Sequence, residues 1–281
     1  MDLIKAIILG IVQGLSEFIP ISSTAHLTLA GYMLGMDVKG NPELWTAQIA
    51  VIQLGTLVAV VAYFWRDLLG IIQGIAKDLK EKNFSLATIN IHTKLGLLIV
   101  LGTIPIVTIG LALKKVIEGT LTKDLTVISV GLIVIAILLF IAEKVGKRER
   151  NIESLGIKDA IIIGLSQCLA LLPGASRSGS TIMASLFLGI DREAAARFSF
   201  LLSIPAILGS GLLELKHALK VLPQSELQNL LIATAVSGLV GYVSIALLLK
   251  YLKNHNTNTV SYTHLRAHET KANLVCRLLL E

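Results

Sequence analysis

Five runs of apolar residues along the chain are long enough to cross a lipid bilayer, for which about 20 residues are needed in a helix. They are Leu44–Trp65, Thr93–Leu113, Leu125–Ala142, Ala195–Leu215 and Leu227–Leu249. Because no polar stretch between them is long enough to form a soluble domain, the pattern predicts an all-α polytopic membrane protein.

Two further apolar segments, Leu3–Leu34 and Lys158–Ile190, are interrupted in the middle by a proline and a cluster of polar residues. Each half is too short to cross a bilayer alone, so each segment is predicted to be a re-entrant hairpin or a broken helix. Irregular backbone at membrane depth is tolerated only where protein or a water-filled cavity surrounds it. The two interruptions therefore predict an internal polar site.

Composition supports this interpretation, since 54% of the 281 residues are hydrophobic and only 16% are charged. The formal net charge of +6 is attributed to cytoplasmic loops that face anionic lipid, and no nucleic-acid partner is expected.

The two interrupted segments resemble each other, since Ile8–Thr24 aligns with Ile162–Ser178 across a one-residue gap. Each is followed by two apolar runs, and the remaining run, Leu125–Ala142, connects the two halves. We therefore expect one membrane domain, residues 1–253, built from two inverted repeats (about 1–118 and 151–253) and a connector (about 119–150). Inverted repeats place their site near the bilayer midplane.

Loop charge predicts the orientation. The segments Arg66–His92 and Lys144–Lys158 carry four and five Lys or Arg side chains and are expected to be cytoplasmic loops. Lys114, Lys115 and Lys123 on the opposite side weaken the asymmetry.

The first polar cluster combines Gln13 and Glu17, four residues apart on one helix face, with Ser22, Ser23, Thr24 and His26 after Pro20. An ionisable side chain inside a membrane segment indicates function by default. The three hydroxyl residues are good caps for a second short helix, whose free backbone N–H groups would bind an anion.

The second cluster, Pro173–Thr181, adds a cation to the same chemistry. Its glycines, including Gly174, allow close approach of a ligand to the backbone, and Ser176, Ser178 and Thr181 supply hydroxyls. Arg177 offers a planar fork suited to phosphate oxygens. A purely structural pair between Glu17 and Arg177 is the alternative, but it leaves the dense hydroxyls unexplained.

These motifs resemble the bacterial undecaprenyl-diphosphate phosphatases, the membrane family associated with bacitracin resistance. The resemblance covers nearly all of Met1–Lys253 and rests on Gln13–Glu17, Ser22–His26 and Pro173–Thr181. It implies a multi-pass protein of the bacterial plasma membrane that hydrolyses a polyprenyl diphosphate to the monophosphate and phosphate, at a site open to the outer face, with a divalent cation as cofactor. Family members often carry Glu where this chain has Gln13, which leaves Glu17 as the only carboxylate of the motif.

In the resulting hypothesis, Mg²⁺ or Ca²⁺ bridges Glu17 and the diphosphate, with the Gln13 carbonyl as a second metal ligand. Ser23 is the preferred nucleophile with Glu17 accepting its proton, and His26 either protonates the leaving lipid phosphate or is itself the nucleophile. Arg177 holds the phosphates together with Ser22, Thr24, Gly174, Ser176, Ser178 and Thr181.

Three alternatives stay open. A polyprenyl-phosphate transporter or flippase would use the same residues without cleavage. Small residues on the spans serve internal packing as readily as contacts in a homodimer. The tail, residues 254–281, matches neither repeat; its histidines permit a metal-binding interpretation, but "SYTHLRAHET" resembles translated adapter sequence, so the tail is interpreted as non-native and excluded from the functional argument.

Overall fold

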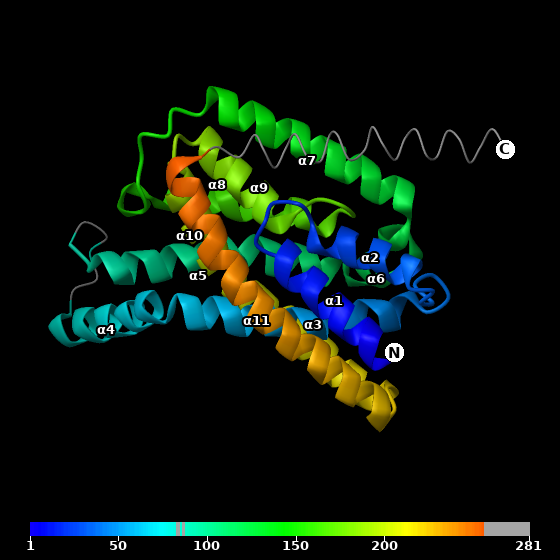
Figure 1. Cartoon of the computed structure of the whole chain (residues 1–281). Coiled ribbons are helices and arrows are strands. Elements are labelled where there is room, and N and C mark those ends of the chain that lie inside the picture. Colours follow the sequence, from blue (N-terminus) through cyan, green and yellow to red (C-terminus); the bar gives the residue numbers. More distant parts are fainter. Residues whose placement is uncertain (83–84, 86–87, 256–281) are drawn as a thin grey trace.

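The computed structural model describes residues 1–82, 85 and 88–255, so the predicted non-native tail lies almost wholly outside the described residues. Over these ranges the fold is built from α-helices and short 3₁₀ turns, without a β-strand (Figure 1). This confirms the all-α class predicted from the hydrophobic pattern.

Among the described residues, five helices are long and apolar enough to cross a membrane, and each coincides with one of the five predicted spans. They are α3 (Pro42–Tyr63), α5 (Ile91–Ala112), α7 (Leu125–Val145), α10 (Arg192–Val221) and α11 (Gln224–Asn254). The predicted bounds differ from the observed ones mainly at helix ends, where charged residues extend α10 and α11 beyond the apolar runs.

Both interrupted segments are pairs of short helices. In the first segment α1 (Leu3–Ser16) is followed by α2 (Ser23–Met33), and in the second α8 (Ile157–Gln167) is followed by a 3₁₀ turn, η3 (Cys168–Leu171), and by α9 (Arg177–Phe187). Each pair turns at the predicted proline and hydroxyl cluster.

The two pairs start at opposite ends of the helix bundle. The N-terminal ammonium of Met1, just before α1, lies 3.3 Å from a carboxylate oxygen of Glu226 in the first turn of α11. By contrast, the backbone just before α8 pairs with the chain that leads into α10, since Arg150 N–H donates to the carbonyl of Gly189. Glu193, in the first turn of α10, in turn pairs with Lys253 in the last turn of α11. Opposite starts agree with inverted halves, while the repeat relationship and the domain division stay predictions.

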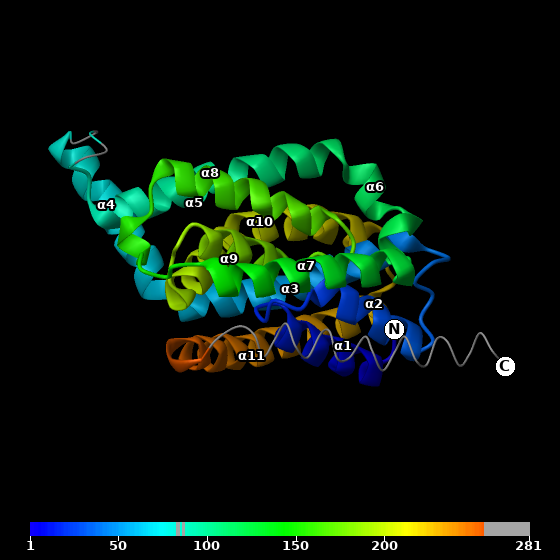
Figure 2. The ribbon, with the colours of Figure 1, turned by 90° about the horizontal axis from the view of Figure 1, so that it is seen from above.

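The segment Arg66–His92, predicted as a charged connection between two spans, contains a helix that the sequence did not predict, α4 (Trp65–Glu81; Figures 1 and 2). Its charged residues alternate with apolar ones, so the segment lacks a continuous apolar run. The helix packs on α5 through Gly70 and Gly74, where an added Cβ would lie about 3 Å from His92 and Thr93 side chains. Two short elements, α6 (Lys114–Glu118) and η1 (Thr120–Lys123), connect α5 to α7.

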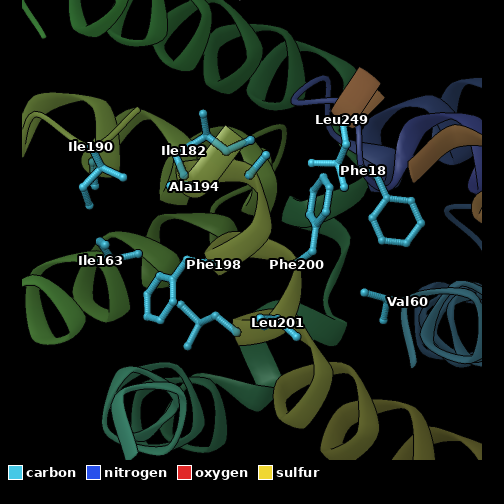
Figure 3. Packing of buried hydrophobic residues seen from close by; sticks show 14 of the residues in the cluster. Phe18, Val60, Ile163, Ile182, Ile190, Ala194, Phe198, Phe200, Leu201 and Leu249 are labelled. Atoms are coloured by element: carbon cyan, nitrogen blue, oxygen red, sulfur yellow. The ribbon is translucent and has the colours of Figure 1, made fainter. Parts of the chain in front are cut away.

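The main hydrophobic core surrounds the N-terminal half of α10 (Figure 3). Phe198 and Phe200 are fully buried there, and the Phe200 ring meets that of Phe18 edge to face at 5.1 Å between centroids. Because Phe18 directly follows Glu17, this aromatic contact fixes the end of the first helix against α10 and so holds the polar site in place.

Candidate active site

The two polar clusters at the turns of the short-helix pairs, around Glu17–Ser23 and Pro173–Ser178, meet inside the protein, as the sequence predicted. They are called the first and second tips below. The guanidinium of Arg177 forms an ion pair with Oε1 of Glu17, although 160 residues separate them in the chain. The Glu17 side chain is 3% exposed and that of Arg177 is 18% exposed. A charge buried to this extent is stable only with an opposite charge and further hydrogen bonds around it.

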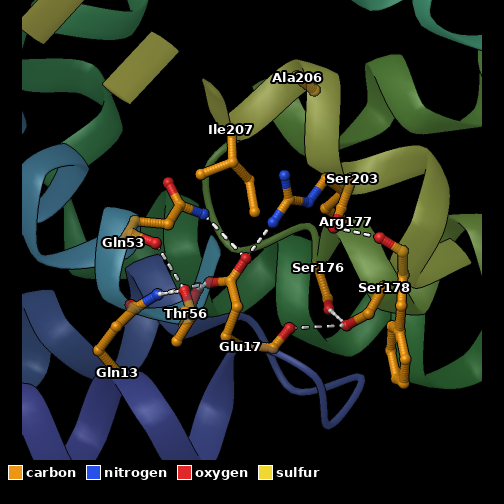
Figure 4. A network of polar contacts seen from close by, with 12 residues as sticks. Gln13, Glu17, Gln53, Thr56, Ser176, Arg177, Ser178, Ser203, Ala206 and Ile207 are labelled. Atoms are coloured by element: carbon orange, nitrogen blue, oxygen red, sulfur yellow. Dashed lines mark hydrogen bonds and ion pairs between the residues drawn. The ribbon is translucent and has the colours of Figure 1, made fainter. Parts of the chain in front are cut away.

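Each carboxylate oxygen of Glu17 accepts two hydrogen bonds. Figure 4 shows those from Gln13, Gln53 and Arg177. Oε1 accepts from Arg177 and, at 2.8 Å, from Nε2 of Gln53. Oε2 accepts from Nε2 of Gln13 at 2.8 Å and from the Ser23 hydroxyl at 2.6 Å. The carboxylate is therefore held in one orientation by donors from four different parts of the chain.

Local helix geometry positions two of these groups. Glu17 is the C-terminal cap of α1, and Gln13 lies one turn before it, so the predicted spacing of four residues brings both side chains onto one face. Gln13 Nε2 also lies 3.3 Å from the hydroxyl of Thr56 on α3. Sequence reasoning missed Gln53 and Thr56, whose only signal was their polarity within the apolar run Leu44–Trp65.

The backbone between the first two helices is strained at the site. Ser22 has a φ of +64°, a left-handed conformation that costs a serine about 1–3 kcal/mol and that is concentrated at functional sites. Its conformation brings Ser23, the first residue of α2, against Glu17. The Nδ1 of His26 lies 2.9 Å from the carbonyl oxygen of Ser22, so this nitrogen is the donor.

The second tip is organised by hydroxyl groups. Ser176 caps α9 by accepting a 3.0 Å hydrogen bond from the N–H of Gly179. The hydroxyl of Ser178 lies 3.1 Å from that of Ser176 and 3.3 Å from the carbonyl oxygens of both Glu17 and Ile19. Ser178 thus joins the two tips directly.

Gly174 is required by close packing behind this tip. Its φ is +82°, and a Cβ there would lie 2.0 Å from the carbonyl oxygen of Ile128 on α7. Thr181 lies deeper, where its hydroxyl is 2.6 Å from that of Ser199 on α10. The connector helix and α10 therefore support the second tip from behind.

A cavity of about 530 Å³ adjoins the ion pair. Eight of the residues predicted for the site line it: Gln13, Glu17, Ser22, Ser23, Thr24, Gly174, Ser176 and Arg177. His26, Ser178 and Thr181 are not among its lining residues in the part of the chain that the structure describes. The structure brings the predicted residues into one region, but their catalytic and binding roles stay predictions.

The far end of the cavity carries a second group of charges. Nζ of Lys123 donates to the hydroxyls of Thr46 and Thr122 at 2.6 and 2.7 Å. Burial of this ammonium lowers the pKa of Lys123 to about 8. Nearby, Lys114 lies 3.2 Å from Glu118 and 3.8 Å from Glu214, and its hydrogen bond with Glu118 raises the pKa of Lys114.

Fold and site together define an integral membrane protein with a buried carboxylate–guanidinium pair beside a cavity, where the turns of two short-helix pairs meet. The model of the bacitracin resistance protein BacA family matches residues 6–266 of the chain. The chain belongs to this family.

Curated relatives agree along almost the whole sequence. The chain is 49% identical over 258 residues to an undecaprenyl-diphosphatase of Syntrophobacter fumaroxidans, with 92% of each chain covered. It is 48% identical over 270 residues to an undecaprenyl-diphosphatase of Chloroherpeton thalassium, covering 92% of this chain and 91% of that one. A relative of the same name from Trichormus variabilis is 44% identical and is covered over 79% of its length.

Proposed function

We infer that this protein is a membrane phosphatase that hydrolyses undecaprenyl diphosphate to undecaprenyl phosphate and inorganic phosphate, and so recycles the lipid carrier of cell-wall synthesis. The observation that carries the inference is the cavity itself, which has Glu17 and Arg177 on one wall and apolar residues of α5 and α10 on the other. Such a cavity suits a substrate with an anionic head and an apolar tail. The family and its curated relatives support the same activity.

Arg177 and the two helix N-termini would bind the diphosphate. Phosphoryl transfer depends mainly on positioning and on stabilising negative charge in the transition state. Ser23 and Arg177 are the first residues of α2 and α9, so the free N–H groups of both helices lie at the site beside the guanidinium. The Arg177 fork contacts phosphate oxygens in this proposal, and Ser22, Thr24 and Ser176 add hydroxyl donors.

Ser23 is the group best placed to attack the terminal phosphorus. Its hydroxyl lines the cavity and already donates to Glu17 at 2.6 Å, so the carboxylate can take the proton as the oxygen attacks. The phosphorus–oxygen bond to the lipid phosphate breaks, and water then releases phosphate from the serine. His26 stays a candidate acid or nucleophile, although its Nδ1 already donates to the Ser22 carbonyl.

A divalent cation fits the donors present only if the substrate completes its coordination. Among the described residues, no group of three or more His, Cys, Asp and Glu side chains is arranged to hold a metal ion. Mg²⁺, however, is commonly bound through one or two carboxylates together with substrate phosphates. Glu17 would hold such a cation, which would supply positive charge to the transferring phosphoryl group. The Gln13 side chain would have to turn its amide over to join as a ligand, because its Nε2 faces Glu17 and donates to Oε2 at 2.8 Å.

The charge distribution supports an opening toward the outer face. The basic segments around Arg150 and Lys253 lie together at one end of the bundle, which the positive-inside rule assigns to the cytoplasm. The cavity runs from Glu17 toward Lys114 and Lys123, near the end where α10 finishes. The substrate would therefore be hydrolysed on the outer side of the membrane.

Phosphate release by the purified protein tests the proposed function. In detergent with undecaprenyl diphosphate and Mg²⁺, the unchanged protein should release inorganic phosphate, and the Arg177→Met variant should lose most of this activity. A protein that moves the lipid across vesicles without releasing phosphate would instead be the carrier that the sequence left open. Nothing in the fold or the comparisons favours that alternative.

A further inference from the structure

A second cleft, of about 250 Å³, lies at the opposite end of the bundle from the mouth of the catalytic cavity. It is formed where α3 passes into α4, together with the first turns of α10 and the last turns of α11. The positive-inside rule assigns this end of the bundle to the cytoplasm. The residues that line the cleft include none of those predicted for catalysis.

The charged side chains of the cleft leave one lysine without a partner. Arg197 donates to Oδ1 of Asp67 at 2.8 Å, and Nζ of Lys253 lies 3.6 Å from a carboxylate oxygen of Glu193. Both acidic residues of the cleft are therefore paired. Lys250 also lines it, but has no ion pair or hydrogen bond within the part of the chain that the structure describes. The cleft thus carries the charge of one unpaired ammonium.

Arg197 offers a second donor in the same cleft. Its Nε is buried from solvent and has no hydrogen-bond partner among the described residues. The rest of the guanidinium is already in use, since it pairs with Asp67 and lies 5.8 Å from the centre of the Phe64 ring. Buried donors in native proteins nearly always meet an acceptor, which can be an ion. The ion pair with Asp67 ties α10 to α4, but it explains neither this Nε nor the free ammonium of Lys250.

The other wall of the cleft is apolar and continues onto a membrane-facing surface. Ala246 and Tyr63 line the cleft, and the Tyr63 ring meets that of Tyr242 at 5.6 Å between centroids. Tyr242 and Val243 lie one turn before Ala246 on α11, a candidate membrane span, and are 47% and 54% exposed. A ligand that fills the cleft can therefore extend along the outside of α11 into the bilayer.

We propose that this cleft binds the phosphate group of an anionic phospholipid from the cytoplasmic leaflet. The phosphate accepts from Lys250 and from Nε of Arg197, and the acyl chains lie along α11 past Tyr242. The single unpaired ammonium matches the single negative charge of a phosphodiester. This site is separate from the proposed catalytic one and does not depend on phosphatase activity.

A lipid suits the cleft better than dissolved phosphate does. Basic pockets between membrane helices on the cytoplasmic side are typical binding sites for anionic headgroups. Tyrosine and tryptophan gather at the level of the headgroups, as Tyr63, Trp65 and Tyr242 do here. Dissolved phosphate would use the two cations and leave the apolar wall uncovered.

Two variants remove the donors without breaking a described contact between helices. Lys250→Met removes the unpaired ammonium. Arg197→Lys keeps a cation beside Asp67 but removes the Nε donor. Lys147→Met is the matched control, because Lys147 is exposed at the same end of the bundle and does not line the cleft. All three should unfold at about the temperature of the unchanged protein, because each replaces only one side chain in contact with solvent.

Trp65 provides a reporter for the bound lipid. It follows Phe64 of the cleft and is 51% exposed, whereas the other tryptophan, Trp45, is 2% exposed. In bilayers that contain phospholipids with brominated acyl chains, quenching of Trp65 fluorescence measures how strongly each headgroup binds beside it. Trp65→Phe shows how much of the quenching belongs to Trp45.

Phosphatidylglycerol should bind beside Trp65 at least about fivefold more tightly than phosphatidylcholine, the effect of one lysine on an anionic headgroup. Lys250→Met should remove most of this preference, Arg197→Lys should reduce it, and Lys147→Met should leave it unchanged. An equal preference in Lys250→Met and Lys147→Met would mean general attraction to a basic surface and would overturn the site.

Dissolved phosphate distinguishes the two sources of the same chemical group. Millimolar inorganic phosphate should leave the quenching by brominated phosphatidylglycerol unchanged at constant ionic strength. If it displaces the lipid from the unchanged protein but has no effect on Lys250→Met, the cleft is a site for free phosphate and the assignment to a lipid headgroup is wrong. Loss of preference in Lys250→Met alone, with Arg197→Lys unaffected, would overturn the role of the Arg197 Nε.

Discussion

The side-chain amide of Gln53 donates a 2.8 Å hydrogen bond to Oε1 of Glu17, the same oxygen that pairs with Arg177. Gln53 comes from α3, outside both short-helix pairs, and lines the cavity. The membrane-spanning scaffold thus orients the carboxylate as much as its own motif does.

Replacing Gln53 should therefore impair a step that depends on the orientation of Glu17. We expect Gln53→Ala to lower kcat for phosphate release by about tenfold, because a misplaced catalytic group loses rate before binding is lost. Gln73→Ala, on the exposed surface of α4, is the matched control. A Gln53→Ala protein with unchanged kcat would show that the hydrogen bond has no role in the reaction.

Removing the charge of Glu17 should have a larger effect. Glu17→Gln keeps the size of the side chain, but it removes the proton acceptor for Ser23 and the counter-charge of Arg177. We expect kcat/KM to fall by about a hundredfold or more, as when a general base is lost. Because a half-buried guanidinium is left without its partner, thermal stability in detergent should fall as well. Near-normal phosphate release would contradict the proposed mechanism.

Replacing the two adjacent serines at the start of α2 one at a time tests which of them is the nucleophile. Ser23→Ala should reduce phosphate release to about a hundredth or less of its normal rate, whereas Ser22→Ala should retain much more, because only Ser23 donates to Glu17. Mass spectrometry of rapidly quenched protein should detect phosphate on Ser23 during turnover. Activity retained by Ser23→Ala would transfer the role to His26 or to water.

Much of this arrangement was predictable from the sequence because apolar runs and proline-broken polar clusters are local signals. The run at Leu125–Ala142 predicted α7, and the hydroxyl cluster after Pro20 predicted the start of α2. The meeting of Glu17 with Arg177 followed from the cost of burying either charge alone. Gln53 could not be found in this way, because a single amide in an apolar span has no periodicity that reveals its partner.

The amphipathic helix α4 was missed for a related physical reason. Its charged residues, such as Lys77 and Asp78, reduce the mean hydropathy of the segment below that of a span, while its packing on α5 depends on Gly70 and Gly74. Close helix contact through small side chains is a tertiary property. Likewise, the sequence placed Ser178 and Thr181 in a motif, but only the fold determines that neither is among the lining residues described for the cavity.

Removal of divalent cations tests the expected cofactor. With Glu17 as the only carboxylate of the motif, a cation would be held largely by the substrate phosphates, so binding should be weak and reversible. We expect a chelator to abolish phosphate release and excess Mg²⁺ or Ca²⁺ to restore it fully. Gln13→Glu, which adds a second carboxylate, should lower the cation concentration needed for half-maximal activity. Full activity in the presence of chelator would exclude the cation requirement.

Lys123 should make the stability of the protein depend on alkaline pH. Burial lowers the pKa of its ammonium from 10.5 to about 8. Below pH 8 both folded and unfolded chains carry this proton, so the cost of burying the charge is present in full. Between about pH 8 and 10.5 the unfolded chain binds a proton that the folded protein has released, so the free energy of unfolding should rise with pH by at most about 1.4 kcal/mol per pH unit.

Comparison with Lys123→Met isolates this effect, because all other titrating groups are shared. The variant loses the hydrogen bonds to Thr46 and Thr122, which lowers stability by a constant amount, but it also loses the pH dependence. The unfolding temperature of the unchanged protein should therefore rise relative to that of Lys123→Met as pH rises from 8 to 10.5. Lys115→Met, at an exposed lysine on α6, should show no such change. A difference that stays constant with pH would mean that the ammonium of Lys123 keeps its ordinary pKa, and that its hydrogen bonds fully compensate its burial.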